Sequence, residues 1–172
     1  AVAGTKAKIY DTRKTVPGWR QLDKYAVRCG GGSNHRMGLH DAILVKDNHL
    51  AKIETNELAT AAFEMIDEAA KLTPPPEFVE FEVDTMEQLD ELLQVSGIDV
   101  ILLDNFAIER MRKAVARRDK AGLTSKVELE ASGNIDLNNV GAVADTGVDR
   151  IAVGAITHSA PALDLGMEIE SH

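Results

Sequence analysis

The sequence predicts a parallel α/β fold, an incomplete TIM-like (β/α) barrel, from three observations. Short apolar runs alternate five or six times with amphipathic segments, as strands and helices do in parallel α/β proteins. The run Val100–Leu103 is apolar on both faces, which suits a parallel strand covered by helices. Charged or small polar residues follow nearly every strand at its C-terminal end, where barrels place their active sites.

Strands and helices are expected in strict alternation. The strands are predicted at Lys8–Thr12, Ala42–Lys46, Phe78–Val83, Val100–Asp104, Val127–Ala131 and Arg150–Val153, and the helices at Trp19–Cys29, Glu54–Leu72, Met86–Val95, Ala107–Ala121 and Leu137–Thr146. The second helix shows its period most clearly, because Leu58, Ala62 and Met65 recur three or four residues apart. Asp84 is expected to cap the helix that begins at Met86.

An open doubly wound sheet shares this alternation, but it would spread the polar strand ends along an edge, whereas a barrel gathers them at one mouth. A complete barrel needs about 250 residues, so a chain of 172 residues predicts fewer units or a truncation. Residues 1–5 look like the end of an earlier helix, which favours truncation. Thr73–Pro76 reads as a stiff connection within a single domain, residues 1–172, with His172 in a disordered end.

The composition is that of a soluble globular protein, with 44% hydrophobic and 27% charged residues. The single Cys29 cannot form an internal disulfide, so a reducing cytoplasm is the expected location. No base motif near Cys29 supports a nucleophilic role. No secretory leader pattern opens the chain, and no apolar run approaches the roughly 20 residues of a membrane span. A membrane partner is therefore not expected.

The charge is divided unevenly along the chain. Residues 1–52 carry a net +6 and the remainder −15, which gives the overall −9. A concentrated positive region on an acidic protein predicts a small, highly anionic ligand, since nucleic acid would need a broad basic face. The side chains that form this region follow strands or lie in loops: Arg13, Lys14, His35, Arg36 and Lys46.

Two loops in the C-terminal third have the form of phosphate-binding turns. Residues 127–136 and 150–157 each contain a strand, a turn of small residues with Gly133 or Gly154, and a helix start. Glycine lets backbone N–H groups approach an oxyanion, and a helix N-terminus adds partial positive charge. The alternative is that both glycines only permit tight turns. Their position on consecutive strands favours phosphate binding.

Three carboxylates lie at the ends of apolar strands, where an unpaired charge would be costly to bury. Glu82 and Asp104 could pair with the cations or receive the hydroxyls or metal of a ligand. Glu130 is placed similarly, and for this residue a structural ion pair inside the barrel is an equally good interpretation. His35, His40 and His49 have no Cys or His at ligand spacing, so a metal-sensing protein is not expected.

The chain resembles the barrel portion of the quinolinate phosphoribosyltransferase family, also called carboxylating nicotinate-nucleotide pyrophosphorylases. The matching segments follow one another in order over essentially the whole chain: Asp11–Arg20, Lys24–Val27, Gly30–Leu39, Leu44–His49, Phe81–Asp84, Leu102–Phe106, Leu129–Asn134 and Val153–His158. The resemblance implies phosphoribosyl transfer from phosphoribosyl pyrophosphate to quinolinate with decarboxylation. The products would be nicotinate mononucleotide, pyrophosphate and carbon dioxide.

The resemblance also implies a role for each site residue. The catalytic residues would be Lys14, Glu82 and Asp104, with Lys14 facing the pyrophosphate and the two carboxylates holding the ribose hydroxyls and helping to organise Mg²⁺. Quinolinate would be bound through its two carboxylates by Arg13, His35, Arg36 and Lys46. Backbone donors of Ser132, Gly133, Gly154 and Ala155 would bind the 5′-phosphate. No general base is assigned, since the cationic ring can accept the electrons of decarboxylation.

The departure from the family is at the start of the chain. The family's N-terminal α/β sandwich domain and first barrel helix are missing, and in the family that domain closes the site of a neighbouring subunit in a homodimer or larger assembly. The expectation is therefore weak substrate binding and little or no turnover. Two alternatives stay open: a related phosphoribosyltransferase-like protein associated with molybdenum transport, and a non-catalytic module that needs its missing domain supplied in trans.

Overall fold

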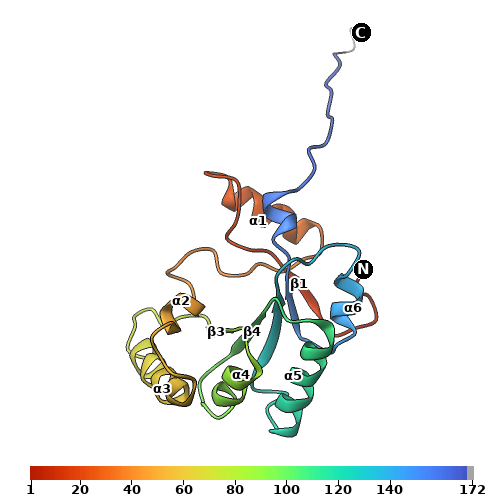
Figure 1. Ribbon diagram of the computed structural model, residues 1–172. Coiled ribbons are helices and arrows are strands. Elements are labelled where there is room, and N and C mark those ends of the chain that lie inside the picture. Colours follow the sequence, from red (N-terminus) through yellow and green to blue (C-terminus); the bar gives the residue numbers. More distant parts are fainter. Residues whose placement is uncertain (170–172) are drawn as a thin grey trace.

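The computed structural model describes residues 1–169 and contains six parallel strands joined by helices (Figure 1). The strands are β1 (Lys8–Tyr10), β2 (Ile43–Val45), β3 (Val79–Val83), β4 (Val100–Asp104), β5 (Glu128–Ser132) and β6 (Arg150–Ala152). The helices are α1 (Arg20–Cys29), α2 (Asp47–Leu50), the 3₁₀ turn η1 (Thr55–Glu57), α3 (Leu58–Ala69), α4 (Met86–Leu92), α5 (Ile108–Lys120), α6 (Val140–Ala144) and α7 (Ala155–His158). The expected domain end at residue 172, and the prediction for His172, fall outside these residues.

The strand order confirms an incomplete barrel. Strands β2 to β6 are neighbours in sequence order, and β1 pairs with β6, so the sheet runs β1-β6-β5-β4-β3-β2. In the described part of the chain β1 and β2 do not pair. The gap is partly filled by Ser33, which forms a single parallel bridge with Tyr10. The barrel therefore opens between its first and second strands.

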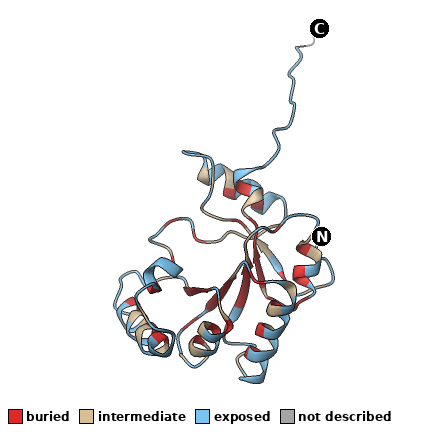
Figure 2. Cartoon of the chain, viewed as in Figure 1, coloured by how far each residue is buried: buried red, intermediate tan, exposed pale blue. Residues whose placement is uncertain are grey.

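The hydrophobic core lies between the strands and the surrounding helices. Side chains of a strand alternate between its two faces, and in β3 Val79, Phe81 and Val83 belong to the core. Glu80 and Glu82 of the same strand are buried on the opposite face, toward the barrel interior. Figure 2 shows the strands buried at the centre and the helices exposed along their outer sides. The outer face of the sheet is thus apolar, and the inner face carries charge.

The helix boundaries show how local chemistry sets each end. α4 is capped by Thr85, whose Oγ1 accepts the backbone N–H of Gln88 at 3.2 Å, while Gln88 Oε1 accepts the N–H of Thr85 at 3.1 Å. The prediction that Asp84 caps this helix is therefore wrong, because this capping box is centred one residue later. The expected helix Glu54–Leu72 is divided into η1 and α3, and it ends at Ala69.

Two short helices lie next to the predicted site, and an extended segment follows the second of them. The four-residue helices α2 and α7 follow β2 and β6 directly. α2 was not predicted from the sequence, whereas α7 lies where a helix start was expected after Gly154. After α7, residues 160–169 extend away from the barrel (Figure 1), with Leu163, Leu165 and Met167 exposed. Among residues 1–169, no helix has the length and apolar composition that a membrane crossing requires.

Candidate active site

The carboxyl ends of the parallel strands bring most of the predicted site residues to one rim. Arg13 and Lys14 follow β1, Lys46 follows β2 and Glu82 lies in β3. Asp104 and Ser132 end β4 and β5 and are partners in the strand register. The ends of β6 and β1 are joined by the hydroxyls of Thr12 and Thr157, 3.0 Å apart. The common rim inferred from the sequence is therefore present.

A buried ion pair fixes the loop that carries His35 and Arg36. Lys24 Nζ on α1 lies 2.5 Å from Asp11 Oδ1 after β1, and both side chains are almost completely buried. Asp11 Oδ1 also accepts the backbone N–H of His35 at 2.7 Å, and its Oδ2 accepts Asn34 Nδ2 at 2.7 Å. Lys24 Nζ donates to the carbonyl of His35 at 3.0 Å. Asp11 and Lys24 thus hold this loop from both sides.

Two arginines lie in one region, and neither forms a salt bridge within residues 1–169. Arg13 Nε is buried without a hydrogen-bond partner in the described residues. Arg36 is buried and donates Nη1 to the carbonyl of Ala42 at 3.0 Å. Burial and, second, the nearby positive charge of Arg13 lower the pKa of Arg36. Two partly dehydrated guanidinium groups that repel each other form a site for an anion.

Lys46, a predicted quinolinate-binding residue, contacts the catalytic candidate Glu82. Lys46 Nζ forms an ion pair with Glu82 Oε2, with the lysine half-exposed and the glutamate buried. The backbone N–H of Lys46 donates to His49 Nδ1 at 3.0 Å, which ties the lysine to the start of α2. A ligand at the rim must therefore share Lys46 with Glu82 or draw it away. Lys14 is exposed, and its backbone N–H donates to Thr12 Oγ1 at 3.1 Å.

Hydrogen bonds of two asparagines, which were not predicted as site residues, connect the ends of β4 and β5. Asn105, which has a φ of 51°, donates Nδ2 to Asp104 Oδ2 at 2.8 Å and its backbone N–H to the carbonyl of Ser132 at 2.9 Å. Asn134, also at positive φ, donates Nδ2 to Asn105 Oδ1 at 3.2 Å. At Gly133 a Cβ would lie 2.1 Å from Asn105 Oδ1. Glycine is required there by the close approach, in addition to its φ of +98°.

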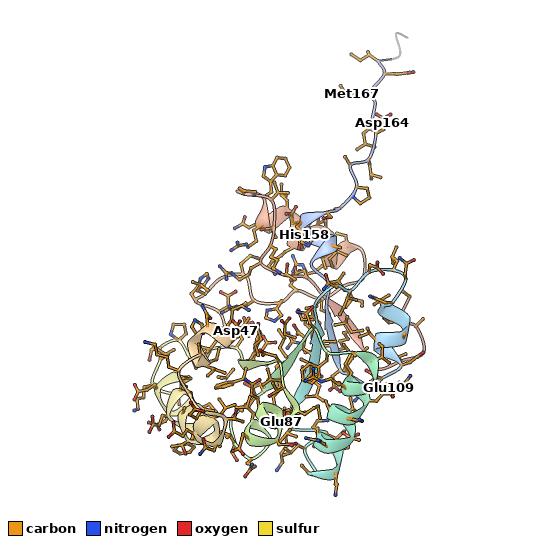
Figure 3. All side chains as sticks on the ribbon, viewed as in Figure 1. Asp47, Glu87, Glu109, His158, Asp164 and Met167 are labelled. Atoms are coloured by element: carbon orange, nitrogen blue, oxygen red, sulfur yellow. The ribbon has the colours of Figure 1, made fainter. Side chains whose placement is uncertain are left out.

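The loop after β6 contains a second residue that was missed. A Cβ at Gly154 would lie 2.9 Å from His158 Nε2, so the imidazole sits directly over this glycine. His158 Nδ1 is 2.6 Å from Ser159 Oγ. Figure 3 shows His158 on α7, the helix that contacts α1. A titratable ring thus lies beside Gly154 and Ala155, the residues predicted to bind phosphate.

His35 lies inside the barrel. Its Nε2 is 2.9 Å from Glu80 Oε2 and 3.5 Å from Glu130 Oε1, and its side chain is 8% exposed. Glu130 Oε2 is 2.7 Å from Arg150 Nε, so the structural ion pair considered for Glu130 is present. Within residues 1–169 these three groups are also the only His, Cys, Asp and Glu cluster close enough to hold a metal ion. Sequence spacing could not reveal this, because the three residues lie on separate strands and loops.

Burial governs the protonation of this interior cluster. It raises the pKa of Glu80 to about 7, against the opposing charges of Arg150 and Arg36. It also raises the pKa of Glu130 to about 7, with a further contribution from Glu80. Burial lowers the pKa of His35, which favours the neutral imidazole, although Glu130 opposes this. Near neutral pH the cluster therefore holds a proton that can reside on either carboxyl group.

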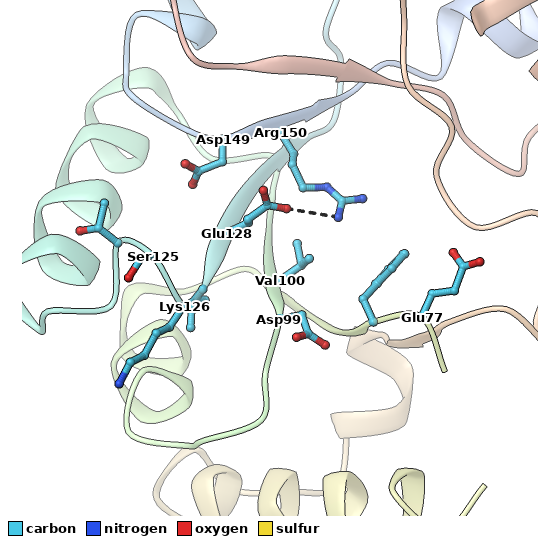
Figure 4. A pocket seen from close by; sticks show the side chains of 11 residues that line it. Glu77, Asp99, Val100, Ser125, Lys126, Glu128, Asp149 and Arg150 are labelled. Atoms are coloured by element: carbon cyan, nitrogen blue, oxygen red, sulfur yellow. Dashed lines mark ion pairs between the residues drawn. The ribbon is translucent and has the colours of Figure 1, made fainter. Parts of the chain in front are cut away.

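A pocket of about 540 Å³ opens at the opposite end of the barrel (Figure 4). It is lined by residues that precede or begin β3 to β6, among them Phe78, Asp99, Lys126 and Arg150. Glu128 and Arg150 form an ion pair across it at 3.6 Å. Because barrels carry their chemistry at the carboxyl end of the strands, we do not assign the active site to this pocket.

The inward orientation of Glu80 could have been predicted from the sequence. In Val79–Val83 two glutamates alternate with apolar residues, so Glu80 must face the same side as Glu82. For Asn105 and Asn134 the indication is weaker: asparagine tolerates a positive φ, so an asparagine just after a strand suggests a tight turn. The burial of Lys24 could not be predicted, because the sequence does not distinguish this lysine from the exposed charged residues of α1.

Comparison with known proteins places this geometry in a family. Residues 1–168 match the family model described as quinolinate phosphoribosyl transferase, C-terminal domain. The nicotinate-nucleotide pyrophosphorylase [carboxylating] of Mycobacterium leprae is 50% identical over 98% of this chain and 56% of its own length. The probable enzyme of that name from Bacillus subtilis is 42% identical over 94% of this chain and 52% of its own length.

Solved structures agree with the sequence matches. The nicotinate-nucleotide pyrophosphorylase of Francisella tularensis aligns with a TM-score of 0.78 and 43% identity, over 91% of this chain and 51% of that one. The Ehrlichia chaffeensis structure aligns with a TM-score of 0.77 and 42% identity, over 92% and 53%. The chain spans about half the length of these relatives. It therefore belongs to the quinolinate phosphoribosyl transferase family and corresponds to the family's C-terminal domain.

Proposed function

We propose that this chain is the barrel portion of an enzyme that transfers a phosphoribosyl group from phosphoribosyl pyrophosphate to quinolinate. Decarboxylation then gives nicotinate mononucleotide, pyrophosphate and carbon dioxide, a step in NAD synthesis. The family membership and the names of relatives from Mycobacterium leprae and Arabidopsis thaliana support this reaction. Because the chain covers about half of those relatives, the activity of the whole enzyme is part of the proposal.

The observation that carries the proposal is a pair of neighbouring arginines, neither of which forms a salt bridge within the described residues. Arg13 and Arg36 come from loops on either side of α1, yet each feels the charge of the other. The charges of Glu80 and Asp41 oppose this repulsion, and a bound anion would offset it further. Quinolinate has two adjacent carboxylates, and each guanidinium can bind one through two parallel hydrogen bonds. Clamping both would aim the ring nitrogen at the ribose carbon, which is a proximity effect.

The remaining rim residues suit the other substrate. Loss of pyrophosphate leaves an oxocarbenium-like ribose, and fixed carboxylates at Glu82 and Asp104 stabilise its developing charge. Lys14, exposed at the rim, would stabilise the departing pyrophosphate. Backbone donors around Ser132, Gly133, Gly154 and Ala155 would bind the 5′-phosphate, with His158 beside Gly154 as an additional donor.

The carboxylates also fit a magnesium ion bound with the pyrophosphate. Mg²⁺ prefers oxygen ligands and uses one or two carboxylates together with substrate phosphates. Glu82 contacts Lys46 through Oε2, and Asp104 contacts Asn105 through Oδ2, so each has a second oxygen available. These two residues would hold the ion, which would neutralise charge on the pyrophosphate.

Assembly into a homodimer or larger oligomer belongs to the same proposal. Trp19, Leu22 and Tyr25 on or beside α1 are each more than half exposed, and large apolar side chains grouped on a surface mark interfaces. The cytoplasmic location predicted from the cysteine count stays a prediction, since one plant relative is named as chloroplastic.

Titration calorimetry with quinolinate tests the proposal directly. The unmodified chain should release heat with quinolinate, and Arg36→Ala should weaken binding by about tenfold or more, the effect of losing a charge-assisted hydrogen bond. Arg112→Ala, on the exposed side of α5, is the matched control and should leave binding unchanged. Unaltered affinity in Arg36→Ala would refute the clamp.

Binding measurements also distinguish the two alternative functions, the molybdenum-associated protein and the non-catalytic module. The molybdenum-associated protein would bind phosphoribosyl pyrophosphate without binding quinolinate. A non-catalytic module would bind neither alone but would associate with an added N-terminal domain from a relative. Formation of nicotinate mononucleotide, assayed with and without that domain, separates a barrel that is active alone from one that needs the domain. Turnover of the isolated chain at the rate of a full-length relative would contradict the expected dependence.

A further inference from the structure

The first residue of α1 is an arginine whose three guanidinium nitrogens all donate hydrogen bonds within the protein. Arg20 Nε donates to Thr15 Oγ1 at 3.2 Å, and its Nη2 donates to the carbonyl of Arg13 at 3.1 Å. Its Nη1 donates to the carbonyl of Met37 at 3.2 Å. The first two acceptors lie in the loop after β1 and the third in the loop after α1. Arg20 therefore connects the loop of Arg13 with the loop of Arg36.

A second cation of α1 holds the same loop on the other side of Arg36. Residues four apart lie on one face of a helix, so Lys24 lies on the face of Arg20. Lys24 Nζ donates to the carbonyl of His35 at 3.0 Å, and Arg20 donates to the carbonyl of Met37. The residues before and after Arg36 are therefore both hydrogen-bonded to this face of α1.

These bonds hold two like charges near each other. The charge of Arg13 acts on Arg36, and unconnected loops that carry like charges would tend to separate. A carboxylate between the two arginines could hold them equally well, but it would compete with an anionic ligand. The acceptors of Arg20 are instead two backbone carbonyls and a hydroxyl. The loops are thus held together without any loss of the positive charge that an anion needs.

We propose that Arg20 is a positioning residue that sets the separation of Arg13 and Arg36, and with it the geometry of the dicarboxylate clamp. This inference rests on the proposed function, because it concerns the same quinolinate site. The geometry requires arginine, since three different nitrogens of one planar group serve three acceptors in two loops. Lysine carries the same charge on a single nitrogen, which cannot replace these bonds.

Direct contact with the substrate is the competing role for Arg20. A guanidinium has five N–H groups, and three of them are used in these bonds. The other two could reach a ligand, because the side chain is partly exposed. However, every nitrogen is already oriented by a loop atom, and the bonds span both loops of the clamp. The arrangement therefore favours positioning.

The test is calorimetry of the unmodified chain and its Arg20→Lys variant. Arg20→Lys keeps the charge and should weaken quinolinate binding by about tenfold or more, the effect of lost hydrogen bonds. The affinity for phosphoribosyl pyrophosphate should change by less than about threefold, because most of its proposed contacts come from β3 to β6. Arg28→Lys, on the exposed side of the same helix, is the matched control and should change neither affinity. Unaltered quinolinate binding in Arg20→Lys would overturn the inference, since charge alone would then suffice.

A double-mutant cycle separates positioning from the other roles. If Arg20 acts through Arg36, Arg20→Lys should weaken quinolinate binding by only about threefold or less in an Arg36→Ala background. The same fold loss in both backgrounds would assign Arg20 to direct contact and would overturn positioning. Equal losses of affinity for both substrates, together with a lower Tm, would indicate a general structural role and would also overturn it.

Amide hydrogen exchange tests the loops without any ligand. Arg20→Lys should speed exchange at residues 12–16 and 35–38, whose backbone is tied to this side chain or lies next to it, and leave the strands unchanged. Unchanged exchange in both loops would contradict the inference. Absence of quinolinate binding by the unmodified chain would instead count against the proposed function, and the exchange result would still decide whether Arg20 holds the two loops.

Discussion

Replacing Lys24 by methionine should destabilise the protein strongly although the side chain lies on an otherwise exposed helix. Methionine keeps most of the apolar stem and removes only the charge. In the folded protein Lys24 is 1% exposed and Asp11 0%, with Nζ and Oδ1 2.5 Å apart. Removing one partner of a buried pair leaves an uncompensated charge, which costs about 3–5 kcal/mol.

The lower end of that range is expected here. After the substitution Asp11 keeps two donors, the backbone N–H of His35 and the side chain of Asn34, each at 2.7 Å. We therefore expect a loss of about 3 kcal/mol in the free energy of unfolding, which corresponds to a fall in Tm of about 6–12 °C for a chain of this size. Urea denaturation followed by circular dichroism measures the first quantity and a thermal melt the second.

Arg112→Met is the control, because Arg112 forms an ion pair with Glu109 in which both side chains are about half-exposed or more. It should cost no more than about 0.5 kcal/mol. The double variant Asp11→Asn/Lys24→Met should recover part of the loss, since no unpaired charge remains. A Lys24→Met variant as stable as Arg112→Met would refute the reasoning that this pair holds the loop of His35 and Arg36.

Three further substitutions test other parts of the structure. Gly133→Ala should cost about 1–3 kcal/mol and weaken phosphoribosyl pyrophosphate binding, because its Cβ would meet Asn105; Gly122→Ala, with a similar φ and open space around it, should cost less in the same urea titration. Thr85→Ala should lower the free energy of unfolding by about 1 kcal/mol, with a matching fall in Tm, through loss of the capping box. Since the folded-state pKa of Glu130 is raised to about 7, the folded protein binds more protons than the unfolded chain, and its stability should fall as the pH rises from about 4.5 to about 7. In Glu130→Gln that decline should be smaller when urea midpoints are compared across this range.

Much of the fold could be predicted because strands and helices differ in the period of their apolar residues. The alternation in Val79–Val83 and the helical spacing of Leu58, Ala62 and Met65 are local properties of the chain. Boundaries were less certain, and the capping of α4 by Thr85 instead of Asp84 shows why. Adjacent polar residues can all serve as caps, and the backbone geometry of the first turn selects one.

The position of the site residues at the strand ends was predictable in a similar way, but the direction in which their side chains point was not. The sequence by itself determined that Arg13, Lys46, Glu82 and Asp104 follow or end parallel strands, and parallel strands in a barrel share one rim. The asparagine lock of Asn105 and Asn134 was not predictable, since it depends on the approach of two loops.

Only the tertiary structure decided which of these charges meet. The closure of β1 onto β6, with Ser33 in the gap, turns His35 inward between Glu80 and Glu130 and leaves Arg36 beside Arg13. The physical reason is that the sign and spacing of charges along a chain do not specify which charges on other strands and loops they meet after closure. Burial then sets their protonation, and burial is a property of the packed barrel alone.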